Sequence, residues 1–388
     1  MNEPLILNPA ETARKLKIGF IGGGINSAVG RAHFCATQLD GTYDLAAGCF
    51  SRNPKTNQDS AAYYGVAADR VYTHADELLA AEAQRLDALV ILTPTSDHLQ
   101  PLLAALKVGL PVICEKAMVA DTKDAAIVSQ AEQQSNGFLA MTYNYTGYPC
   151  VRELRQWIES GRLGRLRHLS ADMPQEGFLR RDRHGNPMQP QAWRLRDGDI
   201  PTVYLDLGTH LHQIVHYLTR LQPLSVGAFH ASYGHFPGVV DYVNASVEYP
   251  DGVHGSFTFG KSMLGQRNGL RIRLYGEQAS AEWAQAAPEI LKLCHNDGRI
   301  EIIDRGGDMN IASQIRYTRF KSGHPAGYIE AFANLYQDIG QCILDYRTQG
   351  DWRSDEVFGS VLAGQGLRFL QTMSDAAVSG QRLPLSLD

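Results

Sequence analysis

Three consecutive glycines lie between an apolar segment and a segment with helical character near the beginning of the chain. Residues 17–21 read KIGFI, and Gly22, Gly23 and Gly24 follow directly. A strand that ends in a glycine turn before a helix lets the backbone approach a pyrophosphate, which the free N–H groups of the helix N-terminus then bind. The motif therefore favours a parallel α/β sheet that binds a dinucleotide, and the competing interpretation is an ordinary strand–helix turn.

Strand-like and helix-like segments alternate through the first part of the chain. The expected strands after the first are residues 43–50, 86–92, 111–115 and 138–143, and the expected helices are 57–64, 74–84, 97–108 and 121–135. Repeated βα units with short connections indicate a parallel sheet with helices on both faces. This second line of evidence removes most of the support for an ordinary turn at the glycines.

A different pattern begins after Pro149. We expect helices at residues 151–160, 206–219, 328–346 and 354–379, strands at 165–172 and between 225 and 303, and a polar loop at 174–199. This order predicts an α+β domain with an extended antiparallel sheet. A chain of 388 residues suits two domains, which we place at residues 1–147 and 148–388.

The composition excludes several classes of protein. The chain is 44% apolar and 20% charged with a formal net charge of −5, so it lacks the basic surface that nucleic acids or anionic membranes attract. No apolar run approaches the roughly 18–20 residues of a membrane span, and residues 1–15 do not have the layout of a signal peptide. The six cysteines are scattered with no CxxC pair, which favours a reduced, cytoplasmic protein.

Glu115 and Lys116 end one of the expected central strands. Ligands of doubly wound sheets bind beyond the carboxyl ends of the strands, so a lysine there can point into the cofactor cleft as a short-range proton donor. An ordinary exposed ion pair at a strand end is an equally good interpretation of these two residues alone.

A second candidate is the pair Asp206 and His210, four residues apart at the start of an expected helix. Side chains at this spacing can converge on one site, where a carboxylate raises the basicity of an imidazole and orients it for general base chemistry. The alternative is that Asp206 caps the helix and His210 is a packing residue.

Two further polar groups have simpler interpretations. His212 and His216 have helical spacing, but no acidic or cysteine partner is placed as in zinc-binding helices, so we expect packing or interface residues and no metal. Basic residues in the 174–199 loop have the charge and the donors to bind a carboxylate or phosphate of a substrate. A solvated loop or subunit contact is favoured for them: Arg180, Arg181, Arg183, His184, Arg194 and Arg196.

The end of the second expected strand indicates which dinucleotide binds. NAD-dependent enzymes usually place an acid there to bond the ribose 2′-hydroxyl. This strand instead ends in Phe50, Ser51, Arg52 and Asn53, with Lys55 nearby. Hydroxyl and cationic groups suit a 2′-phosphate, so the sequence favours NADP over NAD.

Taken together, these residues resemble the Gfo/Idh/MocA family (glucose–fructose oxidoreductase and inositol dehydrogenase) over nearly the whole chain. The matching segments are the glycine turn with Gly30-x-x-His33, Thr93-Pro94 with His98, Gly109-x-Pro111-Val112-x-x-Glu115-Lys116, Asn144-Tyr145-x-Gly147-Tyr148-Pro149, Gly161-Arg162-Leu163-Gly164, Trp193-Arg194 and Asp206-Leu207-Gly208-Thr209-His210. The match favours Gly30 over Ser27 as the third glycine. We therefore expect a loop from Gly24 to Val29 and a helix that begins at Gly30.

The resemblance implies an N-terminal Rossmann fold with a doubly wound parallel sheet, and a C-terminal α+β domain with a large, open, mostly antiparallel sheet. It implies an NAD(P)-dependent oxidoreductase that transfers a hydride between the nicotinamide and a secondary alcohol or ketone of a sugar, cyclitol or related polyol. It also implies a homodimer or homotetramer that associates through the C-terminal sheet. Two alternatives stay open: an NAD-dependent glycosidase that uses transient oxidation, and a non-catalytic, cofactor-binding regulatory relative.

By the same resemblance, Lys116, Asp206 and His210 form the catalytic group. His210 takes the proton of a substrate hydroxyl, Lys116 stabilises the developing alkoxide, and Asp206 orients the group. The implied cofactor-binding residues are Gly22, Gly24, Ile25, Asn26, Ser51, Arg52, Thr93, Pro94, His98, Glu115, Lys116 and Asn144. The implied substrate-binding residues are Lys116, Tyr145, Trp193, Arg194, Asp206 and His210.

The chain departs from the family pattern in two places. Ala117 follows Lys116 where the family has a proline, and residues 200–204 (IPTVY) replace a glycine-rich run before Asp206. Neither change removes a proton-transfer group, but the second alters the pocket and therefore the expected substrate.

Overall fold

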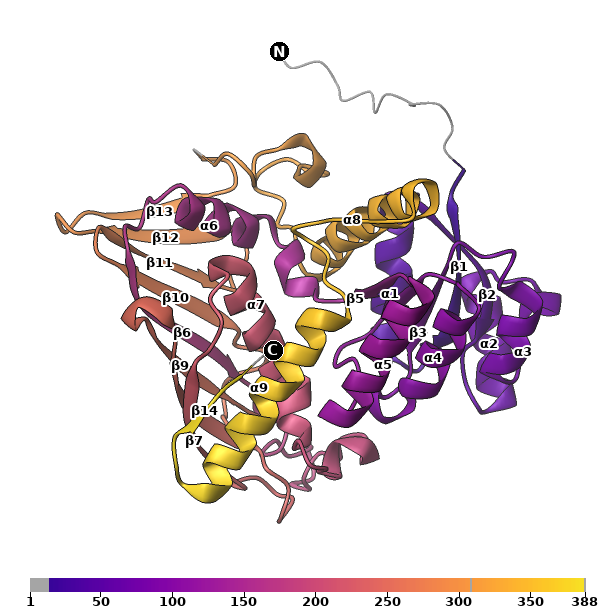
Figure 1. Cartoon of the computed structure of the whole chain (residues 1–388), viewed down its shortest axis with the longest axis horizontal. Helices are drawn as coiled ribbons and strands as arrows, with labels where there is room; N and C mark the ends of the chain where they lie inside the picture. Colours follow the sequence, from indigo (N-terminus) through magenta and orange to yellow (C-terminus); the bar gives the residue numbers. More distant parts are fainter. Residues whose placement is uncertain (1–13, 308, 387–388) are drawn as a thin grey trace.

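The computed structural model describes residues 14–307 and 309–386, and its first sheet is parallel throughout (Figure 1). The strand order is β2-β1-β3-β4-β5. The strands are β1 (Leu16–Gly22), β2 (Tyr43–Cys49), β3 (Ala88–Leu92), β4 (Val112–Cys114) and β5 (Leu139–Met141). Every residue of β3, β4 and β5 is buried, as expected for strands that helices cover on both faces. The predicted doubly wound sheet is confirmed.

Five helices connect these strands and cover the sheet. They are α1 (Ala28–Leu39), α2 (Pro54–Tyr64), α3 (Ala75–Glu82), α4 (Leu99–Lys107) and α5 (Thr122–Ser135). Helix α2 shows how local sequence sets the bounds. Asn53 caps its start by accepting the Thr56 N–H, a proline occupies the first position, and Gly65 ends it in the left-handed conformation.

The predicted start of α1 is wrong by two residues. The helix begins at Ala28 rather than at Gly30, and the side chain of Ser27 caps it by accepting the Gly30 N–H at 3.2 Å. A serine at the N-cap satisfies one of the free N–H groups of the first turn. The loop after the glycines is therefore shorter than the expected stretch from Gly24 to Val29.

The second sheet has nine strands in the order β13-β12-β11-β10-β6-β9-β8-β7-β14. Only β6 and β9 pair in parallel among them, so the predicted mostly antiparallel sheet is confirmed. The strands are β6 (Leu166–Pro174), β7 (Ser225–Ala231), β8 (Tyr242–Glu248), β9 (His254–Gly260), β10 (Arg271–Gly276), β11 (Ala279–Ala284), β12 (Ile290–His295), β13 (Ile300–Asp304) and β14 (Leu383–Pro384). Helices α6 (Pro149–Glu159), α7 (Thr209–Thr219) and α9 (Ser360–Ser379) lie along one face of this sheet, and its other face is open (Figure 1).

The chain returns to the first domain near its end. Helix α8 (Tyr328–Gln349) packs against α1, and its residues Phe332, Tyr336 and Ile339 belong to the same core as the apolar residues of β1. The expected last helix at 354–379 begins only at Ser360. Ser354 instead forms a turn in which its hydroxyl accepts the N–H groups of Glu356 and Val357. A boundary between residues 147 and 148 therefore stays a proposal, because α8 joins the first domain in space.

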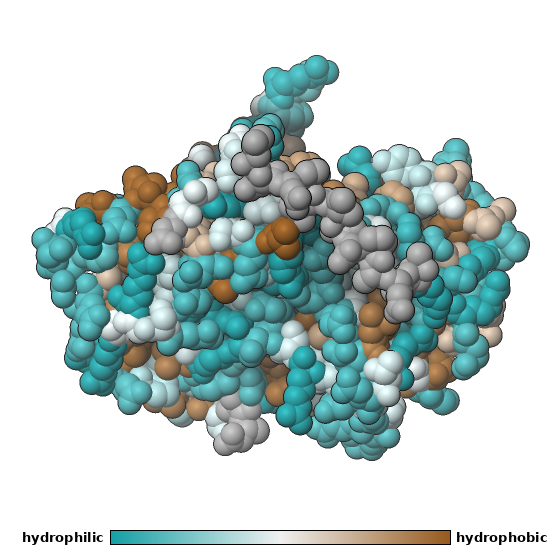
Figure 2. Space-filling model, turned by 90° about the horizontal axis from the view of Figure 1, so that it is seen from above, coloured by the Kyte–Doolittle hydropathy of each residue, from teal (hydrophilic) through white to brown (hydrophobic). Residues whose placement is uncertain are grey.

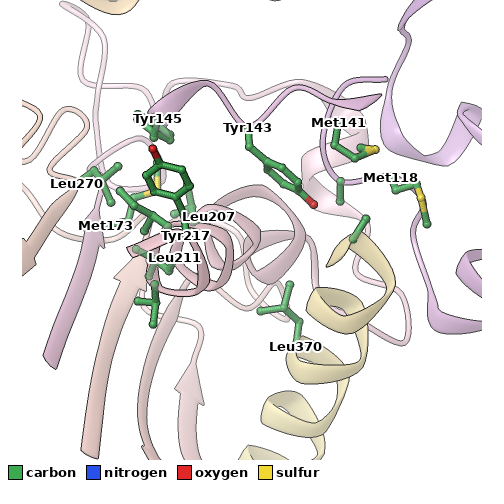
Figure 3. Close-up of a cluster of buried hydrophobic side chains, with 14 of the residues drawn as sticks. Met118, Met141, Tyr143, Tyr145, Met173, Leu207, Leu211, Tyr217, Leu270 and Leu370 are labelled. Carbon is green, nitrogen blue, oxygen red and sulfur yellow. The ribbon is translucent and has the colours of Figure 1, made fainter. Parts of the chain in front are cut away.

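A continuous apolar core joins the two sheets. Figure 3 shows this cluster running from Met118 and Met141, beside the first sheet, through Tyr143 to Tyr145 and Met173 near the second. Because protein interiors are close-packed, a change in side-chain volume at this junction would affect both sheets.

The surface is largely polar. Figure 2 shows hydrophilic side chains over most of the face that it presents, with hydrophobic side chains in small scattered groups. Among the described residues, no helix combines the length and the hydropathy that a membrane span requires. The expectation that no signal peptide precedes the domain falls largely on residues 1–13, outside the described part of the chain.

Candidate active site

A cavity of about 680 Å³ opens at the carboxyl ends of the parallel strands. Its lining begins at the glycine turn and continues past the ends of β2 and β3 to Glu115 and Lys116. Ligands of open α/β sheets bind in this position. The predicted cofactor residues that line this cavity are Gly22, Gly24, Asn26, Ser51, Arg52, Thr93, Pro94, Glu115 and Lys116.

The glycine turn has the close packing that a dinucleotide site needs. Gly22 and Gly23 have φ values of +82° and +71°, which favour glycine. A Cβ on Gly30 would lie 2.0 Å from the carbonyl oxygen of Gly23, so only glycine lets α1 approach the turn. This contact is the role of the third glycine, and it supports the choice of Gly30. The residues present therefore fit a pyrophosphate at the N-terminus of α1.

Three predicted cofactor residues lie outside this cavity. Ile25 donates its backbone N–H to the Ser60 hydroxyl, and Asn144 lines a neighbouring, smaller cavity. His98 is fully buried, with Nε2 2.8 Å from the carbonyl oxygen of Thr93 and Nδ1 3.0 Å from that of Ala117. Both ring nitrogens are thus occupied by backbone, so His98 positions the two loops that border the cavity and does not face it.

Lys116 joins the two domains through Asp206. Its Nζ donates to the Asp206 carboxylate oxygen Oδ1 at 2.9 Å and to the Asp206 carbonyl oxygen at 2.7 Å. Asp206 lies in a π-helical turn (Tyr204–Gly208) directly before α7, and such turns are frequent at functional sites. The Lys116–Ala117 peptide bond is cis.

Two more cations converge on Asp206. Arg194 from the long loop and Lys261 after β9 both contact Oδ2, Lys261 at 2.8 Å. Burial alone would raise the pKa of Asp206, but the charges of Lys116, Lys261 and Arg194 outweigh it and hold that pKa well below its ordinary value. Asp206 is therefore a permanent carboxylate that orients three cations.

Sequence reasoning missed Lys261. This lysine is buried, it donates to Gln175 Oε1 at 2.9 Å as well as to Asp206, and burial lowers its pKa. In the sequence it is a single lysine after the strand-like segment 253–259, with no motif around it. Its position beyond the end of a predicted strand was the one available signal.

His210 lies in the smaller cavity, about 260 Å³, which adjoins the larger one and shares Lys116, Arg194 and Asp206 with it. Burial lowers the pKa of His210 well below its ordinary value, Lys116 lowers it further, and Asp206 offsets only part of this effect. The expectation that Asp206 raises the basicity of this imidazole is therefore wrong in its net effect. His210 is a neutral base in contact with the Tyr145 ring, whose centroid lies 4.6 Å away.

The predicted substrate residues divide between the two cavities. Tyr145 lines the smaller cavity and accepts a hydrogen bond from Asn268 at 2.9 Å. Trp193 lines the larger one, and Arg194, which lies over the Trp193 ring at 4.4 Å, lines both. The structure thus brings Lys116, Asp206 and His210 together with Tyr145 and Arg194, and Trp193 lies at the side of the larger cavity.

Buried side chains outside the two cavities hold the Glu115 carboxylate in position. Its Oε1 accepts from the Thr142 hydroxyl at 2.5 Å and lies 2.8 Å from His33 Nε2. The other nitrogen of His33 contacts the Tyr336 hydroxyl at 2.7 Å. This buried chain ties the loop that carries Lys116 to both α1 and α8.

His212 and His216 pack against one another and against aromatic side chains. Their rings are nearly parallel with centroids 6.4 Å apart, and His212 also contacts Phe369. Burial is the main cause that lowers the pKa of His212 to about 3 and of His216 to about 4. Among the described residues, no group of three or more His, Cys, Asp or Glu side chains is placed to hold a metal ion.

The fold and this site are those of an NAD-binding oxidoreductase. A family model described as an oxidoreductase family with an NAD-binding Rossmann fold matches residues 16–143, and a model described as the GFO/IDH/MocA C-terminal domain matches residues 151–282. The chain belongs to the Gfo/Idh/MocA family, as the sequence resemblance implied.

Individual relatives agree with this assignment. An uncharacterized oxidoreductase, YfiI, of Bacillus subtilis is 26% identical over 95% of this chain and 96% of its own length. An inositol 2-dehydrogenase 4 of Saccharopolyspora erythraea is 31% identical over 39% of this chain and 43% of its own length. An inositol dehydrogenase homolog from Azotobacter vinelandii, solved with NADH and myo-inositol, superposes with a TM-score of 0.87 at 25% identity, covering 96% of this chain and 98% of that one.

Proposed function

We propose that this oxidoreductase transfers a hydride between a nicotinamide cofactor and a secondary alcohol or ketone of a sugar, cyclitol or related polyol. The observation that carries the proposal is the junction of the two cavities. Lys116, Asp206 and His210 line the smaller cavity where it adjoins the cavity of the glycine turn. A hydroxyl held there lies between a proton-accepting group and the cofactor cleft.

Each side chain has a role in this proposal. The bound nicotinamide supplies the hydride acceptor at its C4 atom. His210 accepts the proton of the substrate hydroxyl, because burial keeps its imidazole neutral. Lys116 has a donor left after its two bonds to Asp206, and this N–H stabilises the charge that develops on the substrate oxygen. Asp206 holds the lysine in place.

NADP is the proposed cofactor in preference to NAD. Ser51 and Arg52 line the cavity just beyond β2, and residues 50–58, directly after this strand, include no acidic residue. Arg52 is exposed and pairs with Asp97, and a guanidinium in this cavity supports the proposal of a cofactor with a 2′-phosphate.

We also propose a homodimer or homotetramer that forms through the open face of the second sheet. Exposed Ile300 and Ile302 on the edge strand β13 support this interface, because apolar side chains on an open sheet favour association. A cytoplasmic location is proposed as well, and the six free cysteines support it.

The experiment that tests the proposed reaction is oxidation of a panel of sugars and inositols with NAD⁺ or NADP⁺, followed by nicotinamide absorbance. We expect turnover of at least one substrate and a loss of about 10²- to 10⁴-fold in kcat for His210→Ala. His254→Ala, on the exposed start of β9, is the matched control and should leave kcat unchanged. Cofactor binding without turnover across the whole panel would contradict the proposal and favour a regulatory relative. Release of a free sugar from a glycoside without net cofactor reduction would indicate a glycosidase.

A further inference from the structure

The smaller cavity carries an excess of positive charge. Its charged lining residues, apart from neutral His210, are the cations Lys116, Arg194 and Lys261 and the carboxylates Glu115 and Asp206. Three cations and two carboxylates give the lining a net charge of +1, whereas the whole chain has a net charge of −5. The positive charge is therefore a local feature of this cavity.

Glu115 forms no ion pair with these three cations among the described residues, and His33 stabilises its carboxylate more than the more distant Lys116 charge does. Its carboxylate oxygen Oε1 bonds to Thr142 and His33, which lie behind the cavity. Asp206 alone is in contact with all three cations. A site that gathers three cations around one carboxylate favours a second anion, because buried charges are stable when paired.

Two of the cations have donors to spare. Arg194 contacts Asp206 through Nη1, and within the described residues its Nε and Nη2 have no hydrogen-bond partner. Lys261 uses two of its three N–H donors, on Gln175 and Asp206. A planar guanidinium with free donors matches the two oxygens of a carboxylate.

Of the arginines in the 174–199 loop, Arg194 is the one that lines the two cavities. Arg180, Arg181 and Arg183 lie outside both cavities, and Arg181 and Arg183 bond within the loop itself, as expected for a solvated loop. Arg194 differs from them because its side chain is 25% exposed and is held between the Trp193 ring and Asp206. The sequence-based alternative of a solvated loop or subunit contact therefore does not describe the contact of Arg194 with Asp206, and Arg194 stays a predicted substrate-binding residue.

We propose that the substrate is a sugar acid, whose carboxylate binds Arg194 and Lys261 while its reacting hydroxyl lies at Lys116 and His210. This inference rests on the proposed function, since it names the substrate class of the same site. A carboxylate is favoured over a phosphate because its single negative charge balances the net charge of +1 of the lining, whereas a phosphate carries about −1.5 to −2. The cavity volume of about 260 Å³ is below the roughly 300–1,000 Å³ of pockets for drug-sized ligands, which suits a single small sugar acid.

Matched substrates test the inference. Glucuronate and galacturonate are compared with glucose and galactose, and glucose 6-phosphate is included as the phosphate probe. We expect kcat/KM for at least one acid to exceed that of its neutral partner by more than about tenfold. Equal or faster oxidation of the neutral sugars, or preference for the phosphate, would overturn the sugar-acid inference and leave the proposed dehydrogenase intact.

Absence of oxidation for every substrate is a separate outcome from a lack of preference for the acid. If neither these probes nor the wider panel of sugars and inositols are oxidised with either cofactor, the proposed function fails. Binding of glucuronate and of glucose to the protein loaded with NADPH, the reduced form of the proposed cofactor, then decides the inference. Tighter binding of glucuronate supports an anion site, and equal binding or none overturns it.

Substitutions identify the anion-binding residues. Lys261→Met and Arg194→Gln should each lower the acid-to-neutral ratio of kcat/KM by up to about tenfold, since each removes a charge-assisted hydrogen bond. Lys261→Arg retains the charge and should retain the preference, which separates charge from folding effects. Lys292→Met, at an exposed position of β12, is the control and should leave the ratio unchanged. An unchanged ratio in Lys261→Met and Arg194→Gln would overturn the assignment of these two residues.

Discussion

Lys116 and Asp206 lie 90 residues apart in the chain, and the Lys116 ammonium donates to both the carboxylate and the carbonyl oxygen of Asp206. Lys116 lies two residues after β4 of the parallel sheet, and Asp206 lies in the π-helical turn directly before α7, which covers the second sheet. One side chain therefore fixes the relative position of the two surfaces between which the cavities lie. Both members are largely buried, with 14% and 11% of their side chains exposed, so solvent screens this ion pair only weakly.

Replacement of Lys116 by methionine should depress the reaction without abolishing cofactor binding. The substitution keeps the length of the side chain and removes the charge that stabilises the developing alkoxide. We expect kcat to fall by about 10²- to 10⁴-fold, measured by steady-state kinetics, while the affinity for the reduced cofactor changes much less. Unaltered turnover in this variant would remove Lys116 from the catalytic group.

Removal of the Asp206 charge should destabilise the protein through the cations left behind. Asp206→Asn leaves Lys261 buried without its counter-ion, which costs about 3–5 kcal/mol in the free energy of unfolding. The double variant Asp206→Asn with Lys261→Met should recover part of this loss, because the unpaired charge is then absent. Denaturant unfolding of the two single variants and the double variant measures the coupling, and purely additive losses would contradict it.

Much of the fold follows from residue patterns that act locally. The continuous apolar run that becomes β3 carries its own structural signal, so its existence was predictable. Helix α2 was expected at 57–64 and begins three residues earlier, at Pro54, because Asn53 caps it. The start of α1 shows the limit of motif matching. Ser27 is a good N-cap, but the match at Gly30 favoured a later start, and both residues turn out to be used, one as cap and one as packing glycine.

The sequence predicted which residues form the site better than it predicted their charges and pKa values. Lys116, Asp206 and His210 were expected to converge, and they line one cavity. The protonation of His210 depends on complete burial and on the nearby Lys116 charge, neither of which the Asp-x-x-x-His spacing contains. Lys261 reaches Asp206 only because β9 ends beside the π-helical turn, and this is a property of the folded sheet.

The contact between Gly30 and Gly23 makes a specific prediction for stability. In Gly30→Ala the new methyl would lie 2.0 Å from the Gly23 carbonyl oxygen, which already accepts the Tyr64 hydroxyl at 2.8 Å. Helix α1 must move away from the turn, so we expect a loss of about 3 kcal/mol in the free energy of unfolding and a weakened dinucleotide affinity. Gly364→Ala is the control, because its Cβ meets no atom within 4 Å and the helix gains about 0.5–1 kcal/mol. Equal stability of the two variants would show that the helix can shift freely.

The buried histidine pair should make the protein sensitive to mild acid. Folding lowers the pKa of His212 to about 3 and of His216 to about 4, whereas the unfolded chain protonates histidine near pH 6.5. Between pH 6.5 and 4.5 the unfolded state binds more protons, so stability falls as the pH falls, by about 2 kcal/mol for each histidine. Urea unfolding at a series of pH values measures this slope. His212→Gln should flatten it by about half, and His184→Gln, in the exposed loop, should leave it unchanged.

The pairing of Arg52 with Asp97 gives the sharpest test of the cofactor preference. Arg52 and Asp97 both line the larger cavity. The Asp97 carboxylate pairs with the Arg52 guanidinium, which the 2′-phosphate of NADP would also require as its partner. Arg52→Ala should weaken NADPH binding by about tenfold and leave NADH binding nearly unchanged, because the exposed guanidinium would pair with the 2′-phosphate that NADH lacks. Asp97→Asn should strengthen NADPH binding, since it removes a competing negative charge. Fluorescence titration of the wild type and both variants with each reduced cofactor measures these affinities. If the wild type binds NADH more tightly and Arg52→Ala changes neither affinity, the end of β2 does not select NADP.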